Sequence, residues 1–186
     1  MDTAPPPRIL PLPVEDRDDD VQALLDKFGP TVNIYATMAR RPDLLGRCIP
    51  LGRALRRGRL SAREREIVIL RTGWRCGCAY EWAGHAWLGR AAGMDDADLA
   101  RITEGPDADG WQPNERALLT AADELHEQAR ISDATWSALA AHYDDGELIE
   151  ITMMCGYYHL IAYFLNSLGV ALEEGAEGAE RFPTQA

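Results

Sequence analysis

Apolar residues recur at the spacing of helix faces along most of the chain, and no segment shows the alternation typical of strands. Turn signals such as Gly58, Gly93 and the stretch 105–113 separate these apolar runs. Helix-capping side chains precede several of the runs: Ser61, Asp95 and Ser132. Glu64 follows Ser61 at the spacing of a capping box. The pattern predicts an all-α fold of about seven helices.

The length of 186 residues fits one domain. Residues 1–15 are rich in proline and predict an extended arm, residues 16–172 a single helical domain, and residues 173–186 a polar tail. The stretch Ile151–Leu172 lacks charged side chains and has about the length of a membrane span. Because it also carries polar residues such as His159 and Asn166, we expect a core helix, with a membrane span as the alternative.

A shift of 83 residues superimposes two parts of the chain, with Gly73 on Gly156 and Tyr80 on Tyr163. This match predicts a weak internal duplication of a helix pair, although a shared hairpin composition explains the few identities equally well.

The charge balance is acidic, with 19 basic and 30 acidic residues and a net charge of −11. This charge disfavours binding to nucleic acid or to an anionic membrane surface. Four cysteines are too few for a disulfide scaffold in a chain of this length. The first residues also lack the apolar stretch of a secretory signal, so we expect a cytoplasmic protein with reduced thiols.

One run of the sequence, residues 66–85, carries most of the candidate chemistry. Gly73 and Gly77 indicate that one helix ends and a second begins near Cys76. If the second helix runs from about Gly77, then Cys78, Glu81 and His85 share one of its faces. In the first helical turn, the helix dipole favours a Cys78 thiolate, whereas the charge of Glu81 opposes it.

Glu66, on the preceding helix, reaches this face if the two helices pack together. Ordinary structural roles explain the same residues. A small cysteine is often packed in a core, and Glu81 with His85 is also a common helix-stabilising pair. A zinc site at Cys76, Cys78 and His85 is a weaker alternative, because the C-x-C spacing is tighter than that of most zinc ligands.

The run from Glu66 to His85, with Cys78-Ala-Tyr-Glu81-Trp-Ala-Gly-His85, resembles the signature region of the carboxymuconolactone decarboxylase and alkyl hydroperoxidase D-like family. Residues 156–166 resemble the closing helix of decarboxylase-like members, so that the resemblance covers about residues 30–172. It implies an all-α fold that assembles as homotrimers or homohexamers. It also implies no bound organic cofactor, and we expect no metal at the site.

The sequence departs from the peroxidase branch of that family at one position. That branch uses a C-x-x-C pair with a downstream histidine and an upstream glutamate. Glu66, Cys78 and His85 match three of these residues, but Glu81 stands where the second cysteine is expected. A carboxylate cannot form a disulfide, so a thiol cycle would need Cys76 as the substitute.

We therefore expect a cofactor-free enzyme in which Glu81 and His85 perform acid/base chemistry on a small organic acid, lactone or carbonyl compound. Glu66 would orient His85, and Cys78 would line the pocket. Four further residues are candidates for substrate binding: Tyr80, Trp82, Arg71 and Arg75. Two alternatives remain: a thiol-dependent hydroperoxide reductase that uses Cys78 with Cys76, and a non-catalytic oligomer that binds a small ligand.

Overall fold

The computed structural model describes residues 6–29, 31–173 and 183, and within them it is helical, with no strand. This confirms the predicted all-α class. In the described part of the chain, nine α-helices follow a short 3₁₀ turn at Val14–Asp16. This is two more than expected, because helices as short as α2 contain too few residues to show a period. Their bounds are α1 Asp19–Lys27, α2 Asn33–Met38, α3 Pro42–Arg56, α4 Ala62–Arg75, α5 Ala79–Ala91, α6 Asp96–Glu104, α7 Pro113–Gln128, α8 Asp133–Ala140 and α9 Asp145–Leu168.

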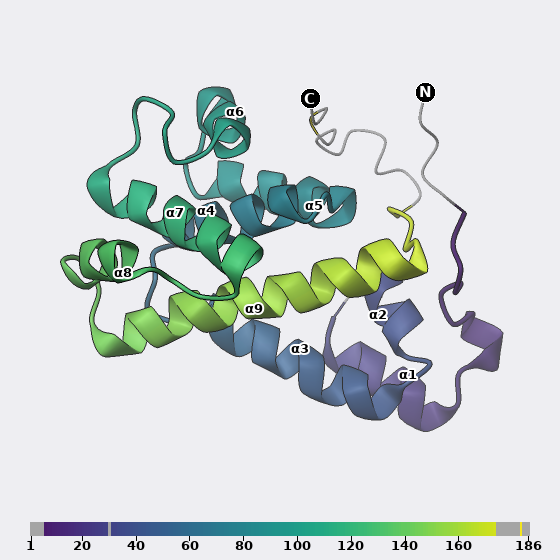
Figure 1. Cartoon of the computed structure of the whole chain (residues 1–186). Coiled ribbons are helices and arrows are strands. Elements are labelled where there is room, and N and C mark those ends of the chain that lie inside the picture. The colour runs from purple at the N-terminus through teal and green to yellow at the C-terminus, as the bar shows by residue number, and fades with distance from the viewer. Residues whose placement is uncertain (1–5, 30, 174–182, 184–186) are drawn as a thin grey trace.

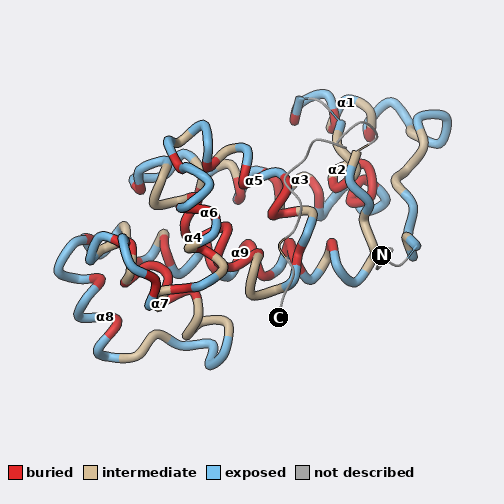
Figure 2. The backbone as a smooth tube through the Cα atoms, turned by 90° about the horizontal axis from the view of Figure 1, so that it is seen from above, coloured by how far each residue is buried: buried red, intermediate tan, exposed pale blue. Residues whose placement is uncertain are grey.

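The long helix α9 runs through the middle of the molecule, between α1–α3 on one side and α4–α8 on the other (Figure 1). It contacts α3, α4, α7 and α8, and α4 in turn contacts α5, α6 and α7. Every residue of α4 from Glu66 to Gly73 is buried. Buried segments lie where α4, α7 and α9 meet, and further ones lie on α2 and α3 (Figure 2). Polar side chains on the buried faces of these helices need hydrogen-bond partners within the protein.

Helix α9 meets that requirement. Among the described residues, it is the one helix long and apolar enough to cross a membrane by length and composition, and half of its most apolar stretch is buried inside the protein. The hydroxyl of Thr152 donates to the carbonyl oxygen of Leu148. Nδ1 of His159 lies 2.8 Å from the carbonyl oxygen of Cys155. These contacts and its four helical neighbours agree with the expected core helix.

The predicted helix starts are confirmed at Ser61, Asp95 and Ser132, each of which accepts a backbone hydrogen bond as an N-cap. The expected helix boundary near Cys76 is confirmed, because α4 ends at Arg75 and α5 begins at Ala79. The chain turns two residues later, at Gly77, whose φ of 60° lies in the left-handed region that favours glycine.

The expected duplication of a helix pair is not found in the structure. Residues 62–91 form two helices, α4 and α5, joined by a turn, whereas the stretch aligned with them forms the single helix α9. Tyr163 is exposed, in contrast to the half-buried Tyr80. The 83-residue match therefore reflects similar helical composition rather than two equivalent hairpins.

The first described residues lie against the helical body. The amide of Arg8 donates to Leu168 at the end of α9, and the amide of Leu12 donates to Ala36 in α2. The tail is described only at Glu173 and Pro183, so most of it lies outside the described residues.

Candidate functional site

The turn between α4 and α5 sets the position of the candidate acid/base residues. Cys78 is the N-cap of α5, and its amide donates to the carbonyl oxygen of Gly73 at 2.9 Å. A Cβ atom at Gly73 would lie 3.5 Å from that of Glu81. This close approach brings α5 against α4, so that Glu66 on α4 reaches His85 on α5.

Two buried carboxylates flank the imidazole of His85. Oε2 of Glu66 lies 2.7 Å from Nδ1, and Oε2 of Glu81 lies 3.4 Å from Nε2. A carboxylate beside Nδ1 fixes the proton on that nitrogen and leaves the lone pair of Nε2 for Glu81 or a substrate. The ring of His85 also packs edge-on against Tyr158, with centroids 5.0 Å apart. The expected convergence of Glu66, Glu81 and His85 is therefore present.

Burial raises the pKa of Glu81 above its usual value, although the charges of His85 and Arg56 partly oppose this. Its Oε2 atom is fully buried and has no hydrogen-bond partner. A carboxyl group in this state holds its proton more tightly than an exposed one, and it has unused hydrogen-bonding capacity. Glu81 thus has the properties of a proton donor.

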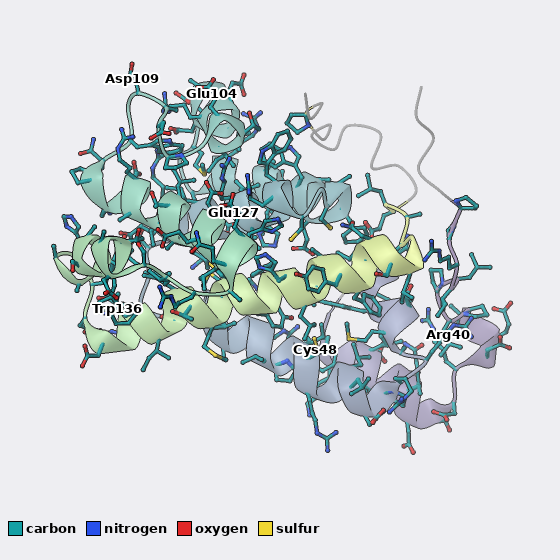
Figure 3. The ribbon with its side chains drawn as sticks, viewed as in Figure 1. Arg40, Cys48, Glu104, Asp109, Glu127 and Trp136 are labelled. Carbon is teal, nitrogen blue, oxygen red and sulfur yellow. The ribbon has the colours of Figure 1, made fainter. Side chains whose placement is uncertain are left out.

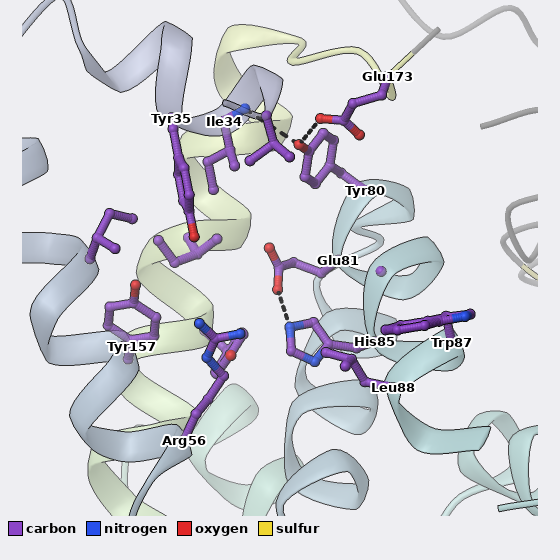
Figure 4. Close-up of a pocket in the computed structure, with 16 residues that line it drawn as sticks. Ile34, Tyr35, Arg56, Tyr80, Glu81, His85, Trp87, Leu88, Tyr157 and Glu173 are labelled. Carbon is purple, nitrogen blue, oxygen red and sulfur yellow. Dashed lines mark hydrogen bonds and ion pairs between the residues drawn. The ribbon is translucent and has the colours of Figure 1, made fainter. Parts of the chain in front are cut away.

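Glu81 and His85 open onto a cavity of about 280 Å³. Figure 4 shows Arg56 on the far side of this space from Trp87, directed toward the same region as Glu81 and His85. Most of the remaining lining is aromatic or aliphatic, including Ile34, Tyr35, Tyr80, Leu88, Tyr157 and Tyr158. A mainly apolar pocket with a few convergent charged groups is typical of a small-molecule site.

Three segments join at the rim of the cavity. Tyr80 donates to Oε1 of Glu173 at 2.6 Å, and the same oxygen accepts from the amide of Asn33 at 2.8 Å. The amide of Ile34 donates to the hydroxyl of Tyr80 at 3.4 Å. The segment after α9 is thereby tied to α2 and α5 beside the cavity.

Arg56 is the arginine that lines this cavity, and no carboxylate among the described residues lies within ion-pair distance of its guanidinium group. Neighbouring arginines are engaged elsewhere. Arg63 pairs with Asp98 at 2.7 Å, and Arg65 approaches Glu66 at 3.3 Å. Arg56 is therefore the cation in the cavity that remains able to bind an anionic ligand.

The structure does not bring three of the proposed substrate-binding residues to the cavity. Arg71 is buried and pairs with Asp123 at 2.7 Å, and Arg75 pairs with Glu127 at 2.5 Å. Trp82 faces the core and is 1% exposed. Tyr80 does line the cavity. Arg71 and Arg75 lie on the face of α4 that packs against α7, so their side chains point to α7 and away from the cavity.

Cys78 is fully buried and lies outside the cavity lining. Burial raises the pKa of its thiol to about 12. Of the two opposing effects considered from sequence, the helix terminus does not dominate, because Cys78 precedes the first turn and its side chain is packed in the core. The thiol is accordingly protonated at neutral pH.

An all-α protein with a buried glutamate–imidazole–glutamate site is the class that this geometry defines. Residues 42–124 match the model of the carboxymuconolactone decarboxylase family. This match covers less than half of the chain and agrees with the resemblance seen in the sequence. No curated protein sequence matches the chain significantly.

Solved structures show the same fold. The chain is similar to the alkylhydroperoxidase AhpD core of an uncharacterized peroxidase-related protein from Ralstonia eutropha JMP134, with 23% identity, a TM-score of 0.77, and coverage of 94% of this chain and 96% of that one. A peroxidase-related protein from Silicibacter sp. TM1040 has 18% identity, a TM-score of 0.79, and coverage of 96% and 98%. The debrominase Bmp8, in complex with 2,3,4-tribromopyrrole, has 16% identity, a TM-score of 0.75, and coverage of 91% and 94%.

Proposed function

We propose that the protein is a cofactor-free enzyme that moves protons at a carbon next to a carbonyl or carboxyl group of a small organic acid, lactone or carbonyl compound. The observation that carries this proposal is the placement of His85 between two buried carboxylates at the wall of a mainly apolar cavity. Such an arrangement provides a base and an acid at neighbouring atoms.

In this mechanism Nε2 of His85 takes a proton from the substrate carbon. The electron pair of that carbon–hydrogen bond shifts onto the carbonyl oxygen, which receives a proton from the carboxyl group of Glu81. Glu66 acts as a positioning residue, because it binds Nδ1 and leaves Nε2 facing the cavity. The imidazolium of His85 then gives its proton to a different carbon, one conjugated with the enol double bond, and the enol hydroxyl returns its proton to Glu81. The carbonyl group re-forms, the substrate is isomerised, and both side chains regain their starting state.

Arg56 would bind the carboxylate of an acidic substrate. Its guanidinium group is the cation of the cavity lining, and the apolar side chains around it exclude water and strengthen the interaction. The overall charge of −11 repels large polyanions but leaves this single local site for a small acid.

The alternative, a thiol-dependent hydroperoxide reductase, draws support from the fold shared with peroxidase-related proteins. The local geometry favours it less, since none of the four cysteines lines the cavity that contains His85. The non-catalytic alternative would use the same cavity for ligand binding alone.

Hydrogen exchange tests the proposal even while the substrate is unidentified. A panel of small keto acids and lactones is incubated with the protein in D₂O, and loss of carbon-bound hydrogen is followed by proton NMR. We expect exchange in at least one compound, a fall of at least about 10²-fold in His85→Ala and Glu81→Gln, and near-normal rates in Cys78→Ser. Exchange in no compound, or exchange that depends on Cys78 and not on His85, would overturn it.

We also propose a homo-oligomeric cytoplasmic protein, as the family resemblance implies for assembly. Apolar side chains that are exposed on α3 and α9 fit a contact between copies of this chain: Leu44, Leu51, Ile149, Met153 and Leu160. Light scattering of the purified protein measures the assembly, and a monomer at micromolar concentration would contradict it.

A further inference from the structure

Three side chains of metal-ligand type meet outside the cavity described above. Cys76 caps the end of α4, His126 lies in the last turn of α7, and His159 lies in the buried middle of α9. Sγ of Cys76 is 3.8 Å from Nδ1 of His126, which is 3.0 Å from Nε2 of His159. These three atoms all lie within 4.8 Å of one another.

The orientation of His159 suits a ligand. Its Nδ1 atom lies 2.8 Å from the carbonyl oxygen of Cys155, which can only accept a hydrogen bond. The proton of the neutral ring is therefore on Nδ1, and the lone pair of Nε2 points into the cluster. Metal-binding histidines are commonly held in this way by a backbone carbonyl on their second nitrogen.

We propose that Cys76, His126 and His159 bind a zinc ion, with water as the fourth ligand. In a tetrahedral zinc site, the usual Zn–N and Zn–S bond lengths place two nitrogen ligands about 3.3 Å apart and a sulfur and a nitrogen ligand about 3.6 Å apart. The observed separations of 3.0 Å and 3.8 Å are close to these values. Thiolate and imidazole are ligands that zinc prefers, and the incomplete burial of Cys76 and His126 gives the ion and the water a path.

The surrounding charges permit a cation. Arg75 lies beside His126, but it pairs with Asp123 and with Glu127, which Figure 3 labels on α7. Arg71 also pairs with Asp123, so two carboxylates balance two guanidinium groups around the cluster.

A zinc ion here would join the ends of α4 and α7 to α9. Cys76 lies two residues before Cys78, the N-cap of the helix that carries Glu81 and His85. The ion would therefore stabilise the turn that positions those residues without contacting them. The inference is independent of the proposed reaction, because zinc binding is measured without a substrate.

Metal titration of the purified full-length chain tests the inference, after dialysis against a chelator. We expect one zinc ion per chain in competition with a chromophoric chelator, and a thiolate-to-cobalt charge-transfer band when Co²⁺ is added. Cys76→Ser should abolish that band, and His126→Ala should weaken zinc binding by more than about 100-fold. The matched controls Cys48→Ser and His142→Ala should retain both.

Circular dichroism verifies that each variant is folded. If the His126→Ala protein is unfolded, the wild-type cobalt spectrum and the Cys76→Ser protein decide the question. The inference is overturned if the wild-type protein binds no zinc, if its cobalt spectrum lacks the thiolate band, or if the control variants lose as much affinity as the ligand variants. The short His126–His159 distance would then be a simple hydrogen bond between the two imidazole rings.

Discussion

Glu66 holds the imidazole of His85 across the packed pair of helices α4 and α5, with Oε2 of the carboxylate 2.7 Å from Nδ1 of the ring. The glutamate is 1% exposed, so water does not compete for this contact. Arg65 lies 3.3 Å from the other carboxylate oxygen and balances its charge. The Nδ1 proton is thereby fixed, and Nε2 is presented to Glu81 and the cavity.

Replacing Glu66 with glutamine should allow His85 to adopt both neutral tautomers instead of one. The amide has nearly the same shape, but it can either accept a hydrogen bond from Nδ1 or donate one to it. We expect long-range ¹⁵N NMR of His85 to change from one tautomer to a mixture, and any proton-transfer activity to fall by about 10²-fold or more. The control Glu64→Gln alters the same helix at its cap and should leave the spectrum unchanged. An unaltered His85 spectrum in Glu66→Gln would contradict the positioning role.

Thiol reactivity should follow burial rather than sequence spacing. Cys78 and Cys155 are buried with pKa values raised to about 12, whereas Cys48 and Cys76 are only partly buried. Because the thiolate is the reactive form, we expect alkylation of Cys48 and Cys76 first, and no Cys76–Cys78 disulfide after peroxide treatment. Mass spectrometry of the native protein reads both outcomes, with urea-unfolded protein as the control. Rapid formation of that disulfide would instead favour the hydroperoxide reductase.

Local sequence patterns predicted the parts of the molecule that local forces determine. The capping box at Ser61 and Glu64 depends on residues three apart, and the shared face of Glu81 and His85 depends on one helical turn. The approach of Glu66 was also predictable, because only a short turn separates its helix from α5. Cys78 was misplaced by a shift of the helix start, which moved it from the first turn to the N-cap.

Tertiary packing determined what the sequence did not indicate. Arg56 enters the cavity because α3 packs against α9, while the nearer Arg71 is turned toward Asp123. No spacing rule links the three residues of the proposed zinc site. Cys76 and His126 are 50 residues apart along the chain, and His126 and His159 are 33 residues apart. Such contacts depend on how three helices cross and leave no local signal.

A methyl group at Gly52 should disturb the packing of α3 against α9. A Cβ atom there would overlap the hydroxyl oxygen of Tyr157 and lie 2.6 Å from its Cζ atom, so the ring must move. We expect Gly52→Ala to lower the free energy of unfolding by about 1–3 kcal/mol. Gly46 on the same helix has no neighbour nearer than 3.8 Å, and Gly46→Ala should stabilise by up to about 1 kcal/mol. Urea denaturation compares the two, and equal effects would refute the predicted contact.

The raised pKa of Glu81 predicts a pH-dependent cost to stability. Because the folded state holds this proton more tightly than the unfolded chain, whose usual value is 4.5, the free energy of unfolding falls as the pH rises above 4.5 toward the folded pKa. Glutamine cannot ionise. We therefore expect Glu81→Gln to be stabilising relative to the wild type at pH 8, with a smaller difference at pH 4.5.

Glu64 provides the control of opposite sign. Burial alone would raise its pKa, but hydrogen bonds from Ser61, Tyr143 and Asn114 outweigh burial and lower it. Its ionised form therefore contributes stability above pH 4.5 that is lost as the pH falls through the folded pKa, so Glu64→Gln should destabilise most at neutral pH. Urea denaturation of both variants from pH 4.5 to 8 measures the two slopes. A pH-independent difference for Glu81→Gln would mean that Glu81 ionises as freely in the folded protein as in the unfolded chain, and it would remove the proton donor from the proposed mechanism.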